Sequence, residues 1–336
     1  MSTTLPENFA SRPAAMDDVQ AVVDLLNACS IEQIGKPRTE AHEIRSDWQA
    51  PTFNLETDTL VVFAPDSKLV GHAALWDPEP HVRIYVAGDV HPEHKGQGIG
   101  TALCQWAEQR VRQSIPKAPA GTRVVMLQET LSTNEVAQEL LRKQGYQLVR
   151  HSFRMLIEMD GSPPEPVVPD GLTIRPFVRD RDMRALVLAE RDAFQDHWGH
   201  VEHPFEEDYQ EWVHWIDNDP DHDPSLWFLA VDGEEIAGVS LCRPKMAEDP
   251  EMGWVDSLGV RRPWRRRGLA LALLHHSFGE LHRHGKRKVG LGVDAQSLTG
   301  ATRLYEEAGM HVNRQYANYE KELRPGEDLS TQSVED

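Results

Sequence analysis

Hydrophobic and polar residues recur in the same order twice along the chain. Each half opens with a short strand and then shows apolar residues at helical spacing, from about 16 to 28 in the first half and from about 180 to 194 in the second. This spacing predicts an amphipathic helix in each half. A variable helical region follows before the next strands.

Two strands joined by a tight turn come next in each half. We expect strands at 60–65 and 68–76 in the first half, and at 227–233 and 235–243 in the second. The pairs Asp66-Ser67 and Asp232-Gly233 between them are typical of β-hairpin turns. These strands should therefore pair antiparallel.

The later part of each half reads as strand, glycine-containing turn, long helix and strand. These strands are expected at 83–90 and 124–130, and at 253–260 and 289–295. A strand–helix–strand unit pairs its strands in parallel. Each half is therefore predicted to be an α/β domain with a mixed, mostly antiparallel sheet, a central parallel pair and flanking helices.

Three landmarks keep the same order in the two halves and indicate an internal duplication. They are Arg-Pro at 12–13 and 175–176, a glycine turn at Gly98 and Gly268, and a glycine before a large apolar residue at 145 and 309. The proline-rich stretch 160–171 is typical of a stiff, solvated linker. We therefore expect domains at 9–159 and 172–324, with a disordered acidic tail at 325–336.

Composition limits the kinds of partner. The chain has 35 Lys and Arg against 54 Asp and Glu, a formal net charge of -19. This surplus of acid argues against a nucleic-acid binder and against docking on anionic lipid, and it favours a cationic small molecule. The apolar runs are too short for a membrane span, and the first residues lack the layout of a signal peptide.

Cysteine usage and histidine spacing give no sign of a metal centre. The three cysteines are far apart and odd in number, which suits neither a disulfide framework nor a zinc site. A histidine-rich cluster at 196–203 fits no tight ligand motif, so we expect it to line the rim of a substrate pocket. We expect a cytoplasmic protein that needs no metal.

The most informative segment is 257–278, where a buried strand runs through a basic turn into an apolar helix. Gly268 lacks a Cβ atom, so a ligand can approach the backbone there. Free N–H groups at the helix start, together with the helix dipole, form an anion site, and the arginines of 265–267 add charge. A basic run of this kind also occurs in nucleic-acid patches, but the acidic composition favours a pyrophosphate. Segment 88–109 repeats the arrangement in the first half.

These features resemble the GNAT acetyltransferase superfamily. Its signature, Gln/Arg-x-x-Gly-x-Gly/Ala between a strand and a helix, is matched fully by RRRGLA at 265–270. KGQGIG at 95–100 matches it except for the lysine. The family's later motif, a turn and a helix ending in Tyr-Glu-x-x-Gly-Phe, corresponds to 292–310. The tandem layout and segment 193–200 are most similar to mycothiol synthase-like members.

The resemblance implies that acetyl-CoA is the co-substrate and that each glycine turn holds its pyrophosphate. In the second half the cofactor-binding residues carried over are Leu258, Gly259, Val260, Arg265, Arg266, Arg267, Gly268, Leu269, Ala270 and Ser297. In the first half they are Val90, Lys95, Gly96, Gln97, Gly98, Ile99, Gly100 and Asn134. Leu258–Val260 would pair with the pantetheine arm as an added strand and present a backbone N–H to the thioester oxygen. Ser297 stands where many members have the asparagine that Asn134 retains.

The resemblance also places Tyr305 at the position of the general acid that protonates the leaving thiolate. A buried aromatic residue on an amphipathic helix is the other interpretation. The first half has Leu141 there, which cannot donate a proton, so that half either binds the cofactor without turnover or is a structural pseudo-enzyme. Asp256 is the expected general base, with Glu251 and the acidic residues of 206–211 as further candidates.

Together these features predict an acetyl-CoA-dependent N-acetyltransferase that acetylates the amine of a small molecule by direct attack in a ternary complex. The second half would carry the chemistry, and no Cys or Ser lies in a nucleophile motif. Two alternatives stay open, an acyl-CoA-binding regulatory module without turnover and a protein N-terminal or lysine acetyltransferase. A monomer or homodimer is expected.

Overall fold

The computed structural model describes residues 5–333 and groups them into two compact units. Unit 1 comprises the chain up to Arg150 together with His203–Asp219 and Tyr316–Leu329. Unit 2 comprises His151–Glu202, Pro220–Gln315 and the chain from Ser330. Each unit therefore draws on both halves of the sequence.

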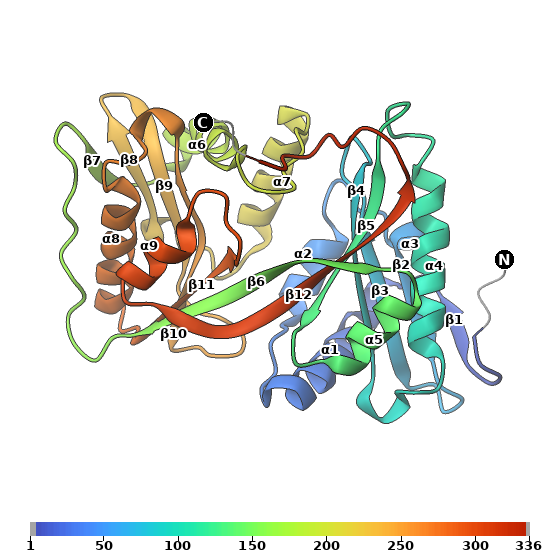
Figure 1. The fold of residues 1–336 in the computed structure, drawn as a ribbon. Helices are drawn as coiled ribbons and strands as arrows, with labels where there is room; N and C mark the ends of the chain where they lie inside the picture. The colour runs from blue at the N-terminus through green and yellow to red at the C-terminus, as the bar shows by residue number, and fades with distance from the viewer. Residues whose placement is uncertain (1–4, 334–336) are drawn as a thin grey trace. The chain divides into compact units, whose positions relative to one another are not determined.

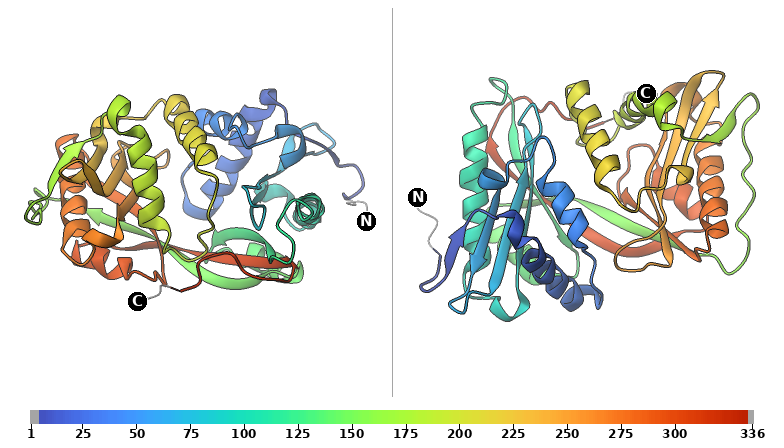
Figure 2. Two further views of the ribbon diagram at one scale, coloured as in Figure 1. Left: turned by 90° about the horizontal axis from the view of Figure 1, so that it is seen from above. Right: turned by 180° about the vertical axis from the view of Figure 1, so that it is seen from behind.

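Unit 1 is a β-sheet with helices on both faces (Figure 1). Its strands, in spatial order, are β1 (Ala10–Arg12), β2 (Thr59–Phe63), β3 (Leu69–Trp76), β4 (Arg83–Val90), β5 (Val124–Leu131) and β12 (His311–Arg324). Its helices are α1 (Val19–Ile34), α2 (Ala41–Trp48), α3 (Leu55–Asp58), α4 (Ile99–Ser114), α5 (Glu135–Lys143) and α7 (Phe205–Asn218). Short 3-10 helices, η1 (Met16–Asp18) and η2 (Pro92–His94), precede α1 and α4. Figure 2 shows α1 and α2 on the opposite face of the sheet from α4.

Unit 2 repeats this layout. Its strands, in spatial order, are β7 (Thr173–Pro176), β8 (Trp227–Asp232), β9 (Glu235–Arg243), β10 (Met252–Val260), β11 (Lys288–Asp294) and β6 (Gln147–Glu158). Its helices are α6 (Arg179–Phe194), α8 (Leu269–Arg283) and α9 (Ala301–Glu307), with η3 (Pro224–Leu226) and η4 (Arg262–Trp264). The helices α6 and α8 cover opposite faces of the sheet (Figure 2).

Each sheet contains one parallel strand pair among antiparallel neighbours. Arg83–Tyr85 of β4 pairs with Val125–Leu127 of β5, and Met252–Val255 of β10 pairs with Lys288–Leu291 of β11. The remaining pairings described within the units are antiparallel. The mixed sheet with a central parallel pair is therefore confirmed in both units.

The last strand of each half completes the sheet of the other unit. Ser152–Glu158 of β6 pairs with β11, whereas Tyr316–Arg324 of β12 pairs with β5. The expected domains 9–159 and 172–324 differ from the units in this respect. Because the halves are duplicates, either copy of the last strand can pair with either central strand, and no local pattern selects between them.

Helix α7, which follows the second half's first helix in sequence, packs in unit 1. His214 Nε2 lies 2.8 Å from the carbonyl oxygen of Ser46 at the end of α2, and Thr52 donates a hydrogen bond to Glu211. The expected domain boundary had placed this helix in the second domain. The contacts that hold α7 in unit 1 are made with residues distant in sequence, so the hydrophobic periodicity of the helix could not predict them.

The tail from 325 differs from the expectation of disorder. The backbone of Glu327 exchanges hydrogen bonds with the turn at 121–123 in unit 1. In unit 2, Thr331 does the same with the loop at 199–200. These pairings satisfy backbone groups that disorder would leave to water, and they hold the tail at two places. Residues 334–336 lie outside the described part of the chain.

The Arg-Pro landmark anchors the first strand of each unit to its first helix. Arg12 donates two hydrogen bonds to Asp18, at 2.6 and 2.8 Å, and Arg175 donates two to Asp182, at 2.7 and 2.9 Å. Burial opposes ionisation of Asp182, but the hydrogen bonds from Arg175 and Arg181 prevail and hold the pKa of its carboxyl well below the usual range. The same bidentate clamp in both units supports the duplication.

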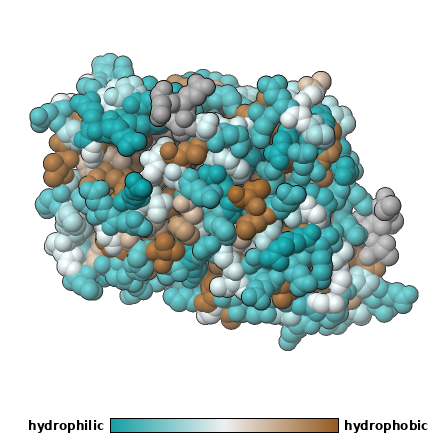
Figure 3. Space-filling view, in the orientation of Figure 1, coloured by the Kyte–Doolittle hydropathy of each residue, from teal (hydrophilic) through white to brown (hydrophobic). Residues whose placement is uncertain are grey.

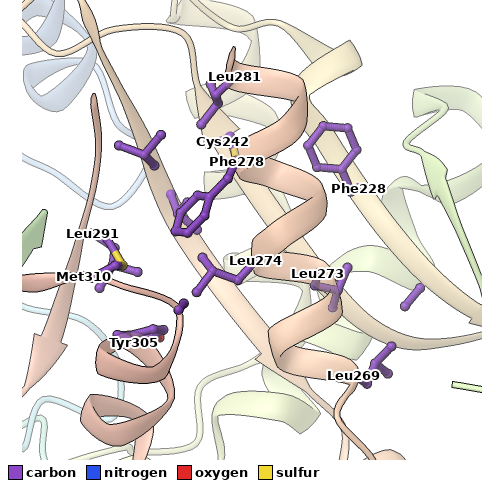
Figure 4. Packing of buried hydrophobic residues seen from close by; sticks show 14 of the residues in the cluster. Phe228, Cys242, Leu269, Leu273, Leu274, Phe278, Leu281, Leu291, Tyr305 and Met310 are labelled. Carbon is purple, nitrogen blue, oxygen red and sulfur yellow. The ribbon is translucent and has the colours of Figure 1, made fainter. Parts of the chain in front are cut away.

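The core of unit 2 lies between the sheet and the pair α8 and α9 (Figure 4). Leu273, Leu274 and Phe278 of α8 are fully buried, and burying a side chain of this size contributes about 1.5–3 kcal/mol. Tyr305 of α9 and Met310 belong to the same cluster. This packing fixes α8 and α9 against the strands that flank the glycine turn.

Hydrophobic residues are scattered among hydrophilic ones on the face drawn in Figure 3. Within residues 5–333, none of the helices has both the length and the apolar character that crossing a membrane requires.

Candidate active site

The parallel strands of unit 2 pair for only part of their length. The ladder between β10 and β11 ends at Val255 and Leu291, although both strands continue. Beyond that point Leu258–Val260 pairs with β9 alone. The edge of β10 that faces β11 is therefore free to accept an extended ligand as an added strand. This brings the predicted residues Leu258, Gly259 and Val260 to one open edge.

A β-bulge at Asp256 separates the paired and unpaired parts of β10. The register with β9 shifts between Val255 and Ser257, which places Asp256 at the irregularity. Its carboxylate Oδ2 lies 2.7 Å from Nε of Arg243. Strand alternation alone would put Asp256 and Leu258 on one face, and the shift in register interrupts that alternation. In unit 1, β4 runs against β3 with no such shift.

Helix α6 packs directly on the open part of β10. A Cβ atom on Gly259 would lie 2.8 Å from the ring of Phe194 and 2.9 Å from Ala193, so only glycine allows this approach. Ser257, on the same face, donates a hydrogen bond to Glu190 Oε1 at 3.1 Å. Sequence reasoning missed Glu190, because nothing local marks it among the many charged residues of α6.

The glycine turn has the same backbone in both units. Arg266 and Gly268 have φ of 60° and 83°, and the equivalent Gly96 and Gly98 have φ of 76° and 87°. Gly268 and Gly98 are the N-caps of α8 and α4. In each unit the first turn of a long helix therefore presents free N–H groups beside the open strand edge, which suits an anion.

Arg265 holds the turn instead of facing solvent. Its guanidinium donates to the carbonyl oxygen of Val260 at 2.8 Å and to that of Ala193 at 3.0 Å, and it pairs with Asp196. Arg262 also binds Asp196. Arg262 and Arg265 lower the pKa of the buried Asp196 to about 2. Arg265 therefore anchors the loop, and its expected contact with a phosphate stays a prediction.

Arg266 and Arg267 are the exposed cations of the turn. Neither makes an ion pair with a residue in the range 5–333, and both immediately precede Gly268, which is exposed as well. A Cβ atom on Gly268 would meet nothing within 4 Å. Leu269 is buried in the core and Ala270 is half-buried, so these two contribute their backbone rather than their side chains.

The histidine-rich cluster at 196–203 does not act as one group. Asp196 clamps the arginines, and Glu202 pairs with Arg191. His197 packs edge-on against Phe194, with ring centroids 4.4 Å apart. Desolvation and the Arg265 charge lower the pKa of His197, although solvent still reaches the ring. His203 belongs to unit 1. The prediction that this cluster lines a pocket rim therefore applies only to the loop that follows Phe194, and it stays a prediction.

We expect Asp196→Asn to weaken acetyl-CoA binding by about tenfold, because it releases Arg262 and Arg265 and loosens the turn. The stability that Asp196 contributes should be fully present above its unfolded pKa of about 3.9 and be lost as pH falls through the folded pKa of about 2. Calorimetric titration and thermal melts measure both effects. Glu202→Gln, which removes an exposed partner of Arg191, is the control, and equal binding by both variants would contradict the clamp.

Tyr305 projects from α9 into the core of unit 2, near Leu274 and Met310 (Figure 4). It is 7% exposed, and burial raises the pKa of its phenol to about 12. Its hydroxyl makes no hydrogen bond to the described residues. Leu258, from the open edge of β10, packs against the same cluster. Tyr305 and Leu258 thus contribute to the same hydrophobic cluster, and their joint role at one site stays a prediction.

The two polar residues expected to contact the cofactor arm bond to the backbone at the start of a helix, Asn134 as the N-cap of α5 and Ser297 from three residues before Gly300, the N-cap of α9. Asn134 Oδ1 accepts a hydrogen bond from the backbone N–H of Ala137 at 3.1 Å. Ser297 Oγ accepts one from Ala301 at 3.3 Å. Each therefore stabilises the start of the second helix of its half.

The glycine turn of unit 1 has less room. A Cβ atom on Gly98 would lie 3.3 Å from Pro6, and one on Gly100 would lie 2.9 Å from Leu140. Lys95 pairs with Glu32, as Arg265 pairs with Asp196. The rest of the predicted set lies nearby, with Val90 ending β4, Ile99 buried and Gln97 exposed. Buried Leu141 occupies the position of Tyr305.

The sequence profile of the acetyltransferase (GNAT) family matches residues 19–146 and, a second time, residues 184–310. The two matches cover most of the chain. The protein belongs to the GNAT family. It is an acyltransferase with two GNAT domains, and the resemblance noted from the glycine turns is confirmed.

This GNAT protein is similar to several known proteins over most of its length. A mycothiol acetyltransferase of Streptomyces scabiei (strain 87.22) is 31% identical over 258 residues, covering 76% of this chain and 75% of the relative. The crystal structure of a GCN5-related N-acetyltransferase from Sphaerobacter thermophilus is 38% identical, has a TM-score of 0.79 and covers 98% of this chain and 100% of that one. A tandem GNAT protein from the clavulanic acid biosynthesis pathway shares the fold at 16% identity, with a TM-score of 0.73 over 95% of this chain and 100% of its own.

Proposed function

We propose that unit 2 is an acetyl-CoA-dependent N-acetyltransferase that acts on the amine of a small molecule. The observation that supports this most is the open edge of β10 at Leu258–Val260, which lies next to a basic turn whose Gly268 faces open space. The bulge at Asp256 and the tyrosine at 305 accompany that edge in unit 2. Unit 1 has neither.

The residues of unit 2 fit acetyl-CoA. The N–H groups of Leu269 and Ala270 and the side chains of Arg266 and Arg267 would hold the pyrophosphate. The free edge of Leu258–Val260 would pair with the pantetheine arm, as an extended chain pairs with a sheet. A backbone N–H of the same edge would stabilise the negative charge that develops on the thioester oxygen.

Tyr305 would donate its proton to the departing sulfur. Burial, which raises its pKa to about 12, keeps the phenol protonated near neutral pH. The three cysteines are free and buried, and burial raises the pKa of the thiols of Cys29 and Cys242 to about 12 and that of Cys104 to about 11. Protonated, buried thiols are poor nucleophiles. This supports direct attack by the amine rather than a covalent acyl-enzyme.

We expect Asp256→Asn to lower kcat/KM for the acceptor by about 10- to 100-fold, because the carboxylate would take the proton that the ammonium must lose before attack. Its position at the bulge, two residues before Leu258, supports this role. Steady-state kinetics with the acceptor varied measures the effect. Glu234→Gln, which removes an exposed carboxylate from the turn between β8 and β9, is the control. A loss confined to the KM of acetyl-CoA would contradict the assignment.

The acceptor is proposed to be small and cationic. The net charge of -19 would attract an amine in its ammonium form, and the relatives named mycothiol acetyltransferase support a small-molecule acceptor. A thiol-release assay with acetyl-CoA and a panel of amines, amino sugars and peptides tests the proposal. Release with small amines is expected. Release only with peptides would favour a protein acetyltransferase, and tight acetyl-CoA binding without release would favour a regulatory module.

A further inference from the structure

The loop that follows α6 is held by the tail of the chain. The backbone N–H of Gly199 donates to the carbonyl oxygen of Thr331 at 2.7 Å, and the N–H of Thr331 donates to the carbonyl oxygen of His200 at 2.9 Å. Thr331 Oγ1 donates a third hydrogen bond, at 3.0 Å, to the carbonyl oxygen of Gln195 at the end of α6. One residue of the tail therefore bonds to both ends of the loop 195–200.

The neighbours of Thr331 extend this contact. The indole Nε1 of Trp198 donates to Oε1 of Gln332 at 2.9 Å, and Gln332 Nε2 donates to Ser330 Oγ at 2.8 Å. Ser330 is buried, with 7% of its surface exposed. The segment 330–332 is thus bonded to the loop through Thr331 and Gln332.

The same loop carries the clamp of the glycine turn. Asp196 binds Arg262 and Arg265, and Arg265 in turn holds the carbonyl oxygens of Val260 and Ala193. A continuous set of contacts within unit 2 therefore runs from segment 330–332 through loop 195–200 to the turn that precedes α8. Each link is a hydrogen bond or an ion pair.

The equivalent loop of unit 1 is held differently. Asn27 of α1 bonds to the backbone of Arg38 and Thr39, and Ser30 donates to the carbonyl oxygen of Lys36 at 2.7 Å. In the second half of the duplication the residues that correspond to Asn27 and Ser30 are Arg191, whose side chain cannot accept a hydrogen bond, and Phe194, whose side chain can make none. The tail supplies backbone hydrogen bonds where the local side chains no longer do.

We propose that Thr331 is a positioning residue of the acetyl-CoA site, and that segment 330–332 orders the turn at 265–270 through loop 195–200. This inference rests on the proposed function of unit 2. It makes the tail, which the sequence gives no reason to place at a site, a part of the binding machinery. Because coupling between two sites is reciprocal, acetyl-CoA bound at the turn tightens the contact between the tail and the loop.

The test is acetyl-CoA binding by full-length variants in a calorimetric titration. Thr331→Pro removes both the N–H and the hydroxyl, and its Kd for acetyl-CoA rises about tenfold. Thr331→Ser keeps both groups and binds like the wild type. Ser333→Pro, at an exposed position beyond the segment, is the control and also binds like the wild type. Equal affinity of Thr331→Pro and wild type overturns the proposal.

Hydrogen exchange separates positioning from a general loss of stability. In the wild type, acetyl-CoA slows exchange at the amides of Gly199 and Thr331, and Asp196→Asn removes this slowing. A merely structural tail gives the same exchange there with and without acetyl-CoA, which also overturns the proposal. A wild type that binds no acetyl-CoA refutes the proposed function, whereas a wild type that binds it with an affinity insensitive to Thr331 refutes this inference alone.

Discussion

Gly268→Glu should abolish acetyl-CoA binding and, with it, acetyl transfer. The substitution places a carboxylate at the N-terminus of α8, directly after Arg266 and Arg267, where the pyrophosphate would lie. Repulsion between like charges and occupation of the site act in the same direction, so we expect the Kd to rise by at least about 100-fold. Isothermal titration with acetyl-CoA measures it. Because a Cβ atom at this position meets nothing within 4 Å, the new side chain should not disrupt packing.

A matched variant separates charge from backbone strain. Gly268 has φ of 83°, which any side chain makes unfavourable, so Gly268→Ala should cost about 1 kcal/mol of stability. It should nevertheless bind acetyl-CoA far better than Gly268→Glu. If the two variants lose affinity equally, the loss comes from the backbone and the turn is not an anion site.

Tyr305→Phe should lower kcat by about 100- to 1000-fold while leaving the Kd for acetyl-CoA nearly unchanged, because a general acid acts only as the thiolate leaves. The hydroxyl makes no hydrogen bond to the described residues, so its removal should cost little stability. Single-turnover kinetics with a competent amine measures the effect. A variant with wild-type kcat would show that Tyr305 is only a core residue.

The buried tyrosine of unit 1 provides the comparison. Tyr146 is equally buried, and its hydroxyl accepts a hydrogen bond from Gln128 at 2.9 Å. Tyr146→Phe should keep wild-type kcat, since unit 1 is proposed to be non-catalytic. The pKa of about 12 for Tyr305 also means that its acid form persists as pH rises, so kcat should not fall between pH of about 7 and about 10.

The repeated pattern of hydrophobic and polar residues was sufficient to predict most of the fold. Hairpins, the parallel pair and the glycine turns all depend on periodicity and on turn residues that lie close together in sequence. The strands expected at 235–243 and 83–90 are those of the structure, and the remaining strands differ only at their ends. Leu258, Gly268 and Tyr305 lie on or beside elements that these local signals predict, namely β10, the turn before α8, and α9.

Features that depend on distant partners could not be predicted in this way. The strand β6 pairs with β11 of the other half, and β12 pairs with β5. Because the two halves are duplicates, no residue of β6 or β12 indicates which half supplies its neighbour. The bulge at Asp256 could not be predicted from residue types, because it depends on the register between β10 and β9. The ion pair between Arg265 and Asp196 could not be predicted either, because the two residues lie far apart in sequence.

Hydrogen exchange of the whole chain with and without acetyl-CoA tests most directly whether unit 2 holds the site. We expect slowed exchange at the amides of 258–260 and 266–270, where the open edge of β10 and the glycine turn would contact the co-substrate. The equivalent turn at 95–100, where Pro6 and Leu140 take up the space, should change little. Slowed exchange at 95–100 without a change at 266–270 would contradict the account.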